Sequence, residues 1–152
     1  MKTDQRDELA ALKAQALGDA GVPEPVRRAL TAGLDLESIR LDARGFWWHE
    51  GERFVNERLS ALFSRSLRRT DGGTWLLTIG AYSYPVVVES AGTFVDRLGW
   101  SRERSGWLTA VTWLGETAEV PAERLGTDGK DGLWLELDDG RHARLRQQAH
   151  QW

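Results

Sequence analysis

The chain has 152 residues, 41% of them hydrophobic and 28% charged, with a formal net charge of −3 and no cysteine. Such values are typical of a globular protein that buries a core without crosslinks, and the missing cysteine excludes disulfides, thiolate metal sites and a cysteine nucleophile. The charged start lacks the apolar segment of a signal peptide and no apolar run is long enough to span a bilayer, so we expect a soluble, cytoplasmic protein outside the membrane.

Residues 1–35 are expected to form an N-terminal helical extension. Residues 4–17 carry a narrow apolar stripe, and Gly18 ends this first helix. Pro23-Glu24-Pro25 then begins a second, shorter helix that stops at Gly33. Its buried side is expected to consist of Val26, Leu30 and Leu34.

Residues 36–92 are expected to form a first α+β unit. Ile39–Leu41 and Phe46–His49 have the composition of short strands. Residues 55–67 predict an amphipathic helix with Asn56 as its N-cap. The apolar face of that helix consists of Val55, Leu59, Leu62, Phe63 and Leu67.

Most of the remaining chain alternates with the period of two that is typical of strands. Turns at Asp71-Gly72-Gly73 and Asp138-Asp139-Gly140 separate these strands, because glycine adopts positive φ without a steric penalty. The expected strands are 75–79, 84–88, 94–98, 107–113, 117–120, 133–137 and 141–145, followed by a helical turn over 146–152. Residues 93–152 thus form a second, β-rich unit, and the fold class is α+β: two small antiparallel-sheet units around one central helix.

Two stretches of the chain resemble each other. Trp48-His49-Glu50-Gly51 has a counterpart in Trp113-Leu114-Gly115-Glu116, and Asp71–Leu77 has one in Asp131–Leu137. An internal duplication explains this order; the alternative is chance similarity of short strands that contain glycine and tryptophan. Because duplicated units must pack together to bury their faces, we expect a ligand or partner at their interface.

The spacing of several segments resembles the bacterial family called domain of unknown function 1285, from Leu36 to the end of the chain. The segments that carry the resemblance are Gly45–Gly51, Leu59–Phe63, Gly73–Thr78, Val88–Ala91, Thr109–Glu116, Leu133–Glu136 and Ala143–Leu145. It implies a duplicated α+β fold with a pleckstrin-homology-like second unit, a binding site between the units and a role in signalling. The chain departs from the family at Thr78–Tyr82, where the family's Thr-Pro-x-Glu-Lys, with its acidic and basic pair, is absent.

No catalytic constellation is evident in the sequence. The histidines His49, His142 and His150 lack the spacing of zinc ligands, and no Gly-x-Ser-x-Gly elbow is present. We therefore expect a protein that is not an enzyme and that uses no cofactor or metal. A small hydrolase is the least favoured alternative.

Tryptophan gives the strongest indication of a binding site. Adjacent Trp47 and Trp48 must point to opposite faces of their strand, and we predict that Trp48 faces outward because it begins the turn repeated at Trp113. Trp75, Trp113 and Trp134 are expected in the core. The candidate ligand-binding residues are Trp48, His49, Arg53, Thr78, Tyr82 and Glu89.

Arginine supports a second hypothesis, nucleotide or nucleic-acid binding. Of the 20 basic residues, 17 are Arg, which suits phosphate recognition, although a GC-rich genome also explains the bias. The candidate basic patch is Arg65, Arg68, Arg69, Arg141, Arg144 and Arg146. Because the net charge disfavours an obligate nucleic-acid binder, we favour a non-catalytic binding or regulatory module for a small molecule, nucleotide or protein.

Overall fold

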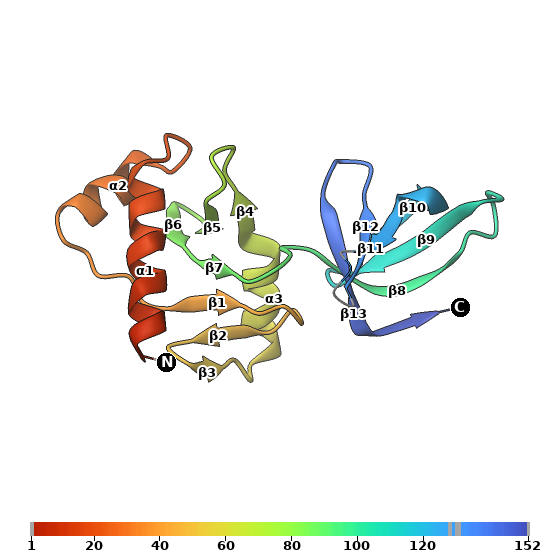
Figure 1. Ribbon diagram of the computed structural model, residues 1–152, viewed down its shortest axis with the longest axis horizontal. Coiled ribbons are helices and arrows are strands. Elements are labelled where there is room, and N and C mark those ends of the chain that lie inside the picture. The colour runs from red at the N-terminus through yellow and green to blue at the C-terminus, as the bar shows by residue number, and fades with distance from the viewer. Residues whose placement is uncertain (1, 128, 130–131, 152) are drawn as a thin grey trace. The chain divides into compact units, whose positions relative to one another are not determined.

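The structure is a computed structural model that describes residues 2–127, 129 and 132–151, with the backbone alone for residues 2–4 and 147–151. The fold is α+β, with three α-helices and three sheets in the described residues. The chain forms two compact units, Met1–Ser90 and Ala91–Trp152, drawn in Figure 1. No described helix is both long and apolar enough to cross a membrane.

The two N-terminal helices of the first unit are confirmed as α1 (Lys2–Leu17) and α2 (Glu24–Thr31). Proline stands in the first turn of α2, where its missing N–H has no intrahelical partner in any case. A small core joins α1 and α2 to a strand of the same unit, and it consists of Ala16, Val22, Leu30 and Leu76. The helical segment therefore shares its core with the strand Trp75–Ile79.

The first unit contains two sheets (Figure 1). The four-stranded sheet has the order β3-β2-β1-β7, with β1 (Ile39–Leu41), β2 (Trp47–His49), β3 (Glu52–Arg53) and β7 (Val87–Val88). β1 pairs antiparallel with β2 and parallel with β7. The three-stranded sheet is antiparallel, with the order β4-β5-β6, and contains β4 (Leu67–Arg69), β5 (Trp75–Ile79) and β6 (Tyr82–Pro85).

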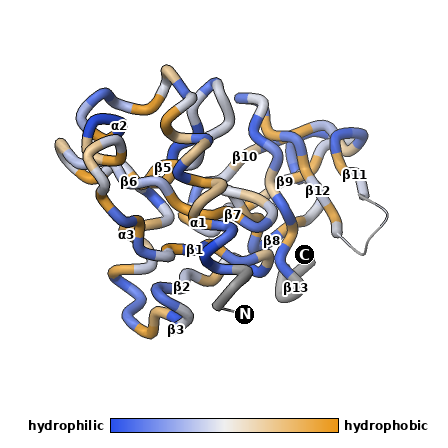
Figure 2. Tube along the Cα trace, turned by 60° about the vertical axis from the view of Figure 1, so that its left-hand side comes forward, coloured by the Kyte–Doolittle hydropathy of each residue, from blue (hydrophilic) through white to orange (hydrophobic). Residues whose placement is uncertain are grey.

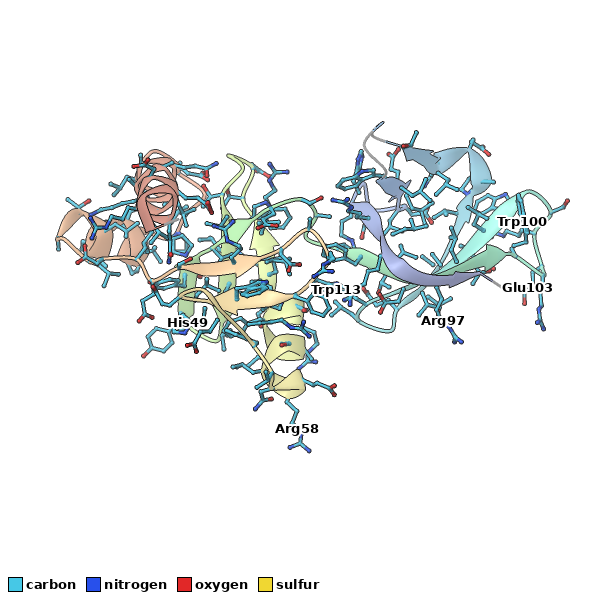
Figure 3. All side chains as sticks on the ribbon, turned by 60° about the horizontal axis from the view of Figure 1, so that its bottom comes forward. His49, Arg58, Arg97, Trp100, Glu103 and Trp113 are labelled. Carbon is cyan, nitrogen blue, oxygen red and sulfur yellow. The ribbon has the colours of Figure 1, made fainter. Side chains whose placement is uncertain are left out.

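The helix α3 (Glu57–Ser66) packs on the four-stranded sheet through a few of its residues. Asn56 is its N-cap, as predicted, because the side-chain oxygen accepts hydrogen bonds from the N–H groups of Arg58 and Leu59. Arg58 points away from the rest of the unit (Figure 3). The expectation of a buried Val55 is wrong, since this residue precedes the cap and is 92% exposed.

The second unit is a six-stranded sheet with the order β10-β9-β8-β13-β12-β11. Its elements are β8 (Phe94–Trp100), β9 (Trp107–Thr112), β10 (Thr117–Pro121), the 3-10 turn η1 (Ala122–Arg124), β11 (Leu125–Thr127), β12 (Leu133–Glu136) and β13 (His142–Gln151). Its core includes Val95, Leu98, Leu108, Ala110, Val120 and Leu135. Figure 2 shows hydrophobic and hydrophilic residues interspersed along this unit. In β9 buried and half-buried residues alternate, because one side of that strand faces this core.

Three further expectations about the fold are wrong. The pairing is not all antiparallel, because β1 pairs with β7 and β8 with β13 in parallel. The segment 84–88 is not one strand, because Pro85 ends β6 and the chain passes to the other sheet at β7. The C-terminal segment is not a helical turn, because β13 continues to Gln151, although residue 152 lies outside the described residues.

The three tryptophans expected in the core are half-buried. Trp113 lies on the ring of Phe94, with the centroids 4.9 Å apart. Arginine guanidinium groups lie over the rings of Trp75 and Trp134, at 5.3 and 5.9 Å. These rings therefore contribute to the edge of each core, where one face is covered by a charged side chain.

Candidate functional site

An apolar groove in the first unit begins on the hairpin of β5 and β6. The register pairs Leu77 with Tyr84 and Ile79 with Tyr82. Directly opposite residues of two paired strands point to the same face, so all four side chains line one surface. Gly80 adopts a φ of 61° in the tight turn between them, which brings Ile79 and Tyr82 to the exposed tip of the hairpin.

Three other segments of the first unit complete the groove, which has a volume of about 390 Å³. The helix α2 and the residues after it supply Pro25, Val26, Ala29, Leu34 and Leu36, β1 supplies Ile39 and α3 supplies Phe63. None of these described lining residues carries a charge. Several are unusually exposed for large apolar side chains: Leu34 is 45%, Ile79 38% and Tyr82 83% exposed. Leu34 was expected on the buried side of α2, but it follows the end of that helix.

Polar groups gather where Tyr84 lines the groove. The Tyr84 hydroxyl oxygen accepts a hydrogen bond of 2.6 Å from the backbone N–H of Glu37. Burial raises the pKa of Tyr84 above its ordinary value, and the Glu37 and Glu50 carboxylates raise it further, against the effect of the backbone hydrogen bond. His49, labelled in Figure 3, places its Nε2 atom 3.6 Å from the Glu37 carboxylate.

Trp48 lies on the opposite face of β2 from Trp47. Trp47 is 1% exposed and meets the Phe63 ring edge-on, with the centroids 5.5 Å apart. Trp48 is half-buried, and its indole N–H donates to Asp42 over 2.8 Å. The prediction that Trp48 is the outward ring is therefore confirmed.

A polar pocket of about 460 Å³ surrounds Trp48. Arg40, directly across the β1–β2 pair from Trp48, forms ion pairs with Glu8 and Glu89. The second oxygen of Glu89 accepts a 3.0 Å hydrogen bond from the Ala43 N–H. The described carboxylates of this pocket are thus already bound by groups of the protein itself.

The structure divides the six candidate ligand-binding residues among different places. Trp48 and Glu89 line the polar pocket, whereas Tyr82 lines the apolar groove. Arg53 lies beside Trp48 in the sheet, but its guanidinium covers the Phe46 ring at 4.0 Å. The Thr78 hydroxyl shares a 3.0 Å hydrogen bond with Ser83.

The candidate basic residues fall in both units. Arg65 is in the last turn of α3, and Arg68 and Arg69 line an open hollow of about 960 Å³ beside Asp19. In the second unit Arg141 pairs with Asp139 at 2.6 Å and Arg146 with Asp96 at 2.9 Å. Arg144 lies over Trp134, as described above.

The described residues contain no group of three or more His, Asp or Glu placed to hold a metal ion. The residues that sequence reasoning missed are the walls of the apolar groove, above all Ile79 and Tyr84. The sequence contained a signal for Ile79. Ile79 and Tyr82 flank the two-residue turn Gly80-Ala81, where polar side chains are usual.

Comparison with known proteins finds similarity at the level of the fold. No protein-family model and no curated protein matches the chain. The crystal structure of a DUF1285 family protein from Silicibacter pomeroyi DSS-3 is similar to 74% of this chain, with a TM-score of 0.60 and 18% identity, and the chain spans 64% of its length. A DUF1285 family protein from Shewanella baltica OS155 is similar to 73% of the chain, which spans 85% of it, with a TM-score of 0.53 and 20% identity. The resemblance predicted from the residues is therefore confirmed for the fold: this chain has the fold of the DUF1285 family proteins.

Proposed function

We propose that this chain is a non-catalytic binding module that holds a small apolar ligand in the groove of its first unit. The observation that carries this proposal is the groove itself, which is lined by uncharged residues and leaves Leu34, Ile79 and Tyr82 exposed. Ligand sites in proteins are typically concave and mostly apolar, with volumes of about 300–1,000 Å³. The 390 Å³ of this groove falls within that range.

Exposed apolar side chains around a groove support binding through the hydrophobic effect. Removal of apolar surface from water contributes about 25 cal/mol per Å², and the open positions of Ile79 and Tyr82 leave such surface to be covered. Small ligands also require a few placed polar groups to fix their orientation. The Tyr84 hydroxyl, which accepts a hydrogen bond from the backbone N–H of Glu37, is such a group in this groove.

The groove lies entirely within Met1–Ser90, so this proposal holds whatever the arrangement of the two units.

We also propose a regulatory role in signalling, an internal duplication and a pleckstrin-homology-like second unit. The duplication is supported by the two similar stretches of the sequence, Trp48–Gly51 and Trp113–Glu116. Nucleotide binding through the arginines has less support, because Arg141 and Arg146 already have carboxylate partners.

A neutral fluorescent probe tests the proposal directly. N-phenyl-1-naphthylamine, whose emission rises in an apolar environment, is expected to bind the chain saturably in a one-to-one ratio. Ala29→Trp fills the groove with an indole ring and should abolish the binding. Ala11→Trp adds the same ring at an exposed position of α1 outside the groove and should leave the binding unchanged. Equal binding by both variants, or no saturable binding at all, contradicts the proposal.

A further inference from the structure

The charge distribution around the apolar groove restricts what its ligand can be. The walls are uncharged, so the part of the ligand inside the groove must be apolar. The acidic residue Glu37 adjoins the groove, because it follows the wall residue Leu36 and its backbone N–H donates a 2.6 Å hydrogen bond to the hydroxyl of the wall residue Tyr84. Burial is the main cause of the raised pKa of Tyr84, and the Glu37 and Glu50 carboxylates add to it. Their negative field at this hydroxyl disfavours an anionic ligand group and favours a cationic one.

The two carboxylates differ in how available they are. The Glu50 carboxylate accepts a 2.7 Å hydrogen bond from the Ser38 N–H and another from Gln5, so it is held by the protein. The Glu37 side chain is 66% exposed, and its carboxylate lies 3.6 Å from the Nε2 atom of His49. A carboxylate with this exposure can turn toward a ligand, and it is the one we expect to contact a charged group.

Both arginines of α2 are held by other groups of the protein. Arg28 forms an exposed ion pair with Glu24 at 2.6 Å. Arg27 donates from its Nε atom to the Val22 carbonyl oxygen, in the segment before the helix. The partners of these two cations are Glu24 and the Val22 carbonyl, whereas the chain neighbour of the wall residue Leu36 is the acidic Glu37.

We infer that the ligand of this groove is an amphiphilic amine, with an alkyl or aryl body in the groove and an ammonium group at the Glu37 and Tyr84 end. This inference rests on the proposed function and adds the class of ligand to it. The apolar body supplies most of the affinity through burial. The ammonium group supplies selectivity over neutral and anionic molecules of the same shape.

Three ligands with the same eight-carbon chain separate the contribution of the head group: octylamine, 1-octanol and octanoate. Isothermal titration of the full chain at neutral pH should show octylamine binding about fivefold more tightly than 1-octanol, since exposed charge pairs contribute up to about 1 kcal/mol. Octanoate should bind more weakly than 1-octanol. The advantage of the amine should shrink at high salt.

Variants of two exposed glutamates locate the effect. Glu37→Gln should remove the advantage of octylamine and leave the affinity for 1-octanol unchanged, whereas Glu57→Gln, on the first turn of α3, should change neither. If 1-octanol or octanoate binds as tightly as octylamine, the inference is wrong and the proposed function stands. If none of the three binds, or if Ala29→Trp binds them as the natural chain does, both are wrong.

Discussion

The indole N–H of Trp48 donates to the Asp42 carboxylate over 2.8 Å, which joins β2 to the turn that precedes it. The other oxygen of the same carboxylate accepts 2.9 Å hydrogen bonds from the N–H groups of Arg44 and Phe46. One side chain therefore organises the β1–β2 turn and fixes the ring of the outward tryptophan. Because β1 and β2 are three residues each, the hairpin depends strongly on these bonds.

Asp42→Ala should lower the free energy of unfolding of the first unit by about 2–3 kcal/mol, because three donors lose a charged acceptor. Asp42→Asn should lower the free energy of unfolding by less, since its amide oxygen can still accept hydrogen bonds. Far-ultraviolet circular dichroism in urea follows this unit, because all α-helices of the described residues lie in it. Asp71→Ala, at an exposed turn position, is the matched control and should have little effect. Equal stability of the two alanine variants would show that the Asp42 bonds contribute nothing net.

Trp47→Ala should destabilise the first unit by about 3–5 kcal/mol, from lost burial and the cavity that remains. Trp47 is 1% exposed, packs against Phe63 and donates to the Ser64 hydroxyl over 3.1 Å. Trp48→Ala should cost clearly less, because its ring is only half-buried. Urea unfolding of the two variants measures the difference, and equally large losses from both would mean that both rings belong to the core.

The stability of the first unit should fall in acid through Asp19. Hydrogen bonds from the Thr70 hydroxyl and the Gly21 N–H hold the pKa of Asp19 below its ordinary value of 3.8. A carboxylate with a lowered pKa in the folded state stabilises the fold above its unfolded pKa and loses that contribution as the pH falls through the folded pKa. Asp19→Asn should therefore be less stable than the natural chain at neutral pH, and the gap should narrow below pH 3.8. A gap that stays constant in urea titrations from neutral pH to about pH 3 would contradict this assignment.

Gly72 is required because Asp19 lies against it. A Cβ atom at Gly72 would meet the Asp19 carboxylate at 2.5 to 2.8 Å, closer than such atoms approach without displacement. Gly72→Ala should destabilise the first unit, and most of that cost should vanish in the Asp19→Ala background, so the two changes are not additive. Gly126→Ala, where nothing lies within 4 Å of the added atom, is the control. Additive costs in the double variant would mean that the carboxylate is not the obstacle.

Local features of this fold could be predicted because the groups that make them are close in the sequence. Asn56 caps α3 through N–H groups two and three residues ahead of it, so the pattern of one helix start contains all the participants. The path of residues 84–88 could not be predicted in this way. The parallel pairing of Val87 with Arg40 joins residues far apart in the chain, and an apolar segment has the same pattern whether it forms one strand or two.

The apolar groove could not be predicted from the sequence for the same reason. Tyr82 was a candidate, but the partners that make it part of a groove come from α2, the segment after it, β1 and α3. Nothing in the local pattern of Leu34 or Ile79 distinguishes a core residue from a groove wall, because both are apolar residues in an amphipathic setting. Trp48 and Glu89, two of the candidates from the sequence, line one polar pocket, since β2 and β7 both flank β1 and Glu89 directly follows β7.

The isoleucine methyl groups test the central claim most directly. The chain contains two isoleucines, Ile39 and Ile79, and both line the apolar groove. With carbon-13 at the δ1 methyls, the spectrum has two signals, and N-phenyl-1-naphthylamine should shift both through its ring current. We expect the two shifts to saturate with one common midpoint and to disappear in Ala29→Trp but not in Ala11→Trp. Two signals that stay in place while the probe binds elsewhere on the chain would contradict the groove as the binding site.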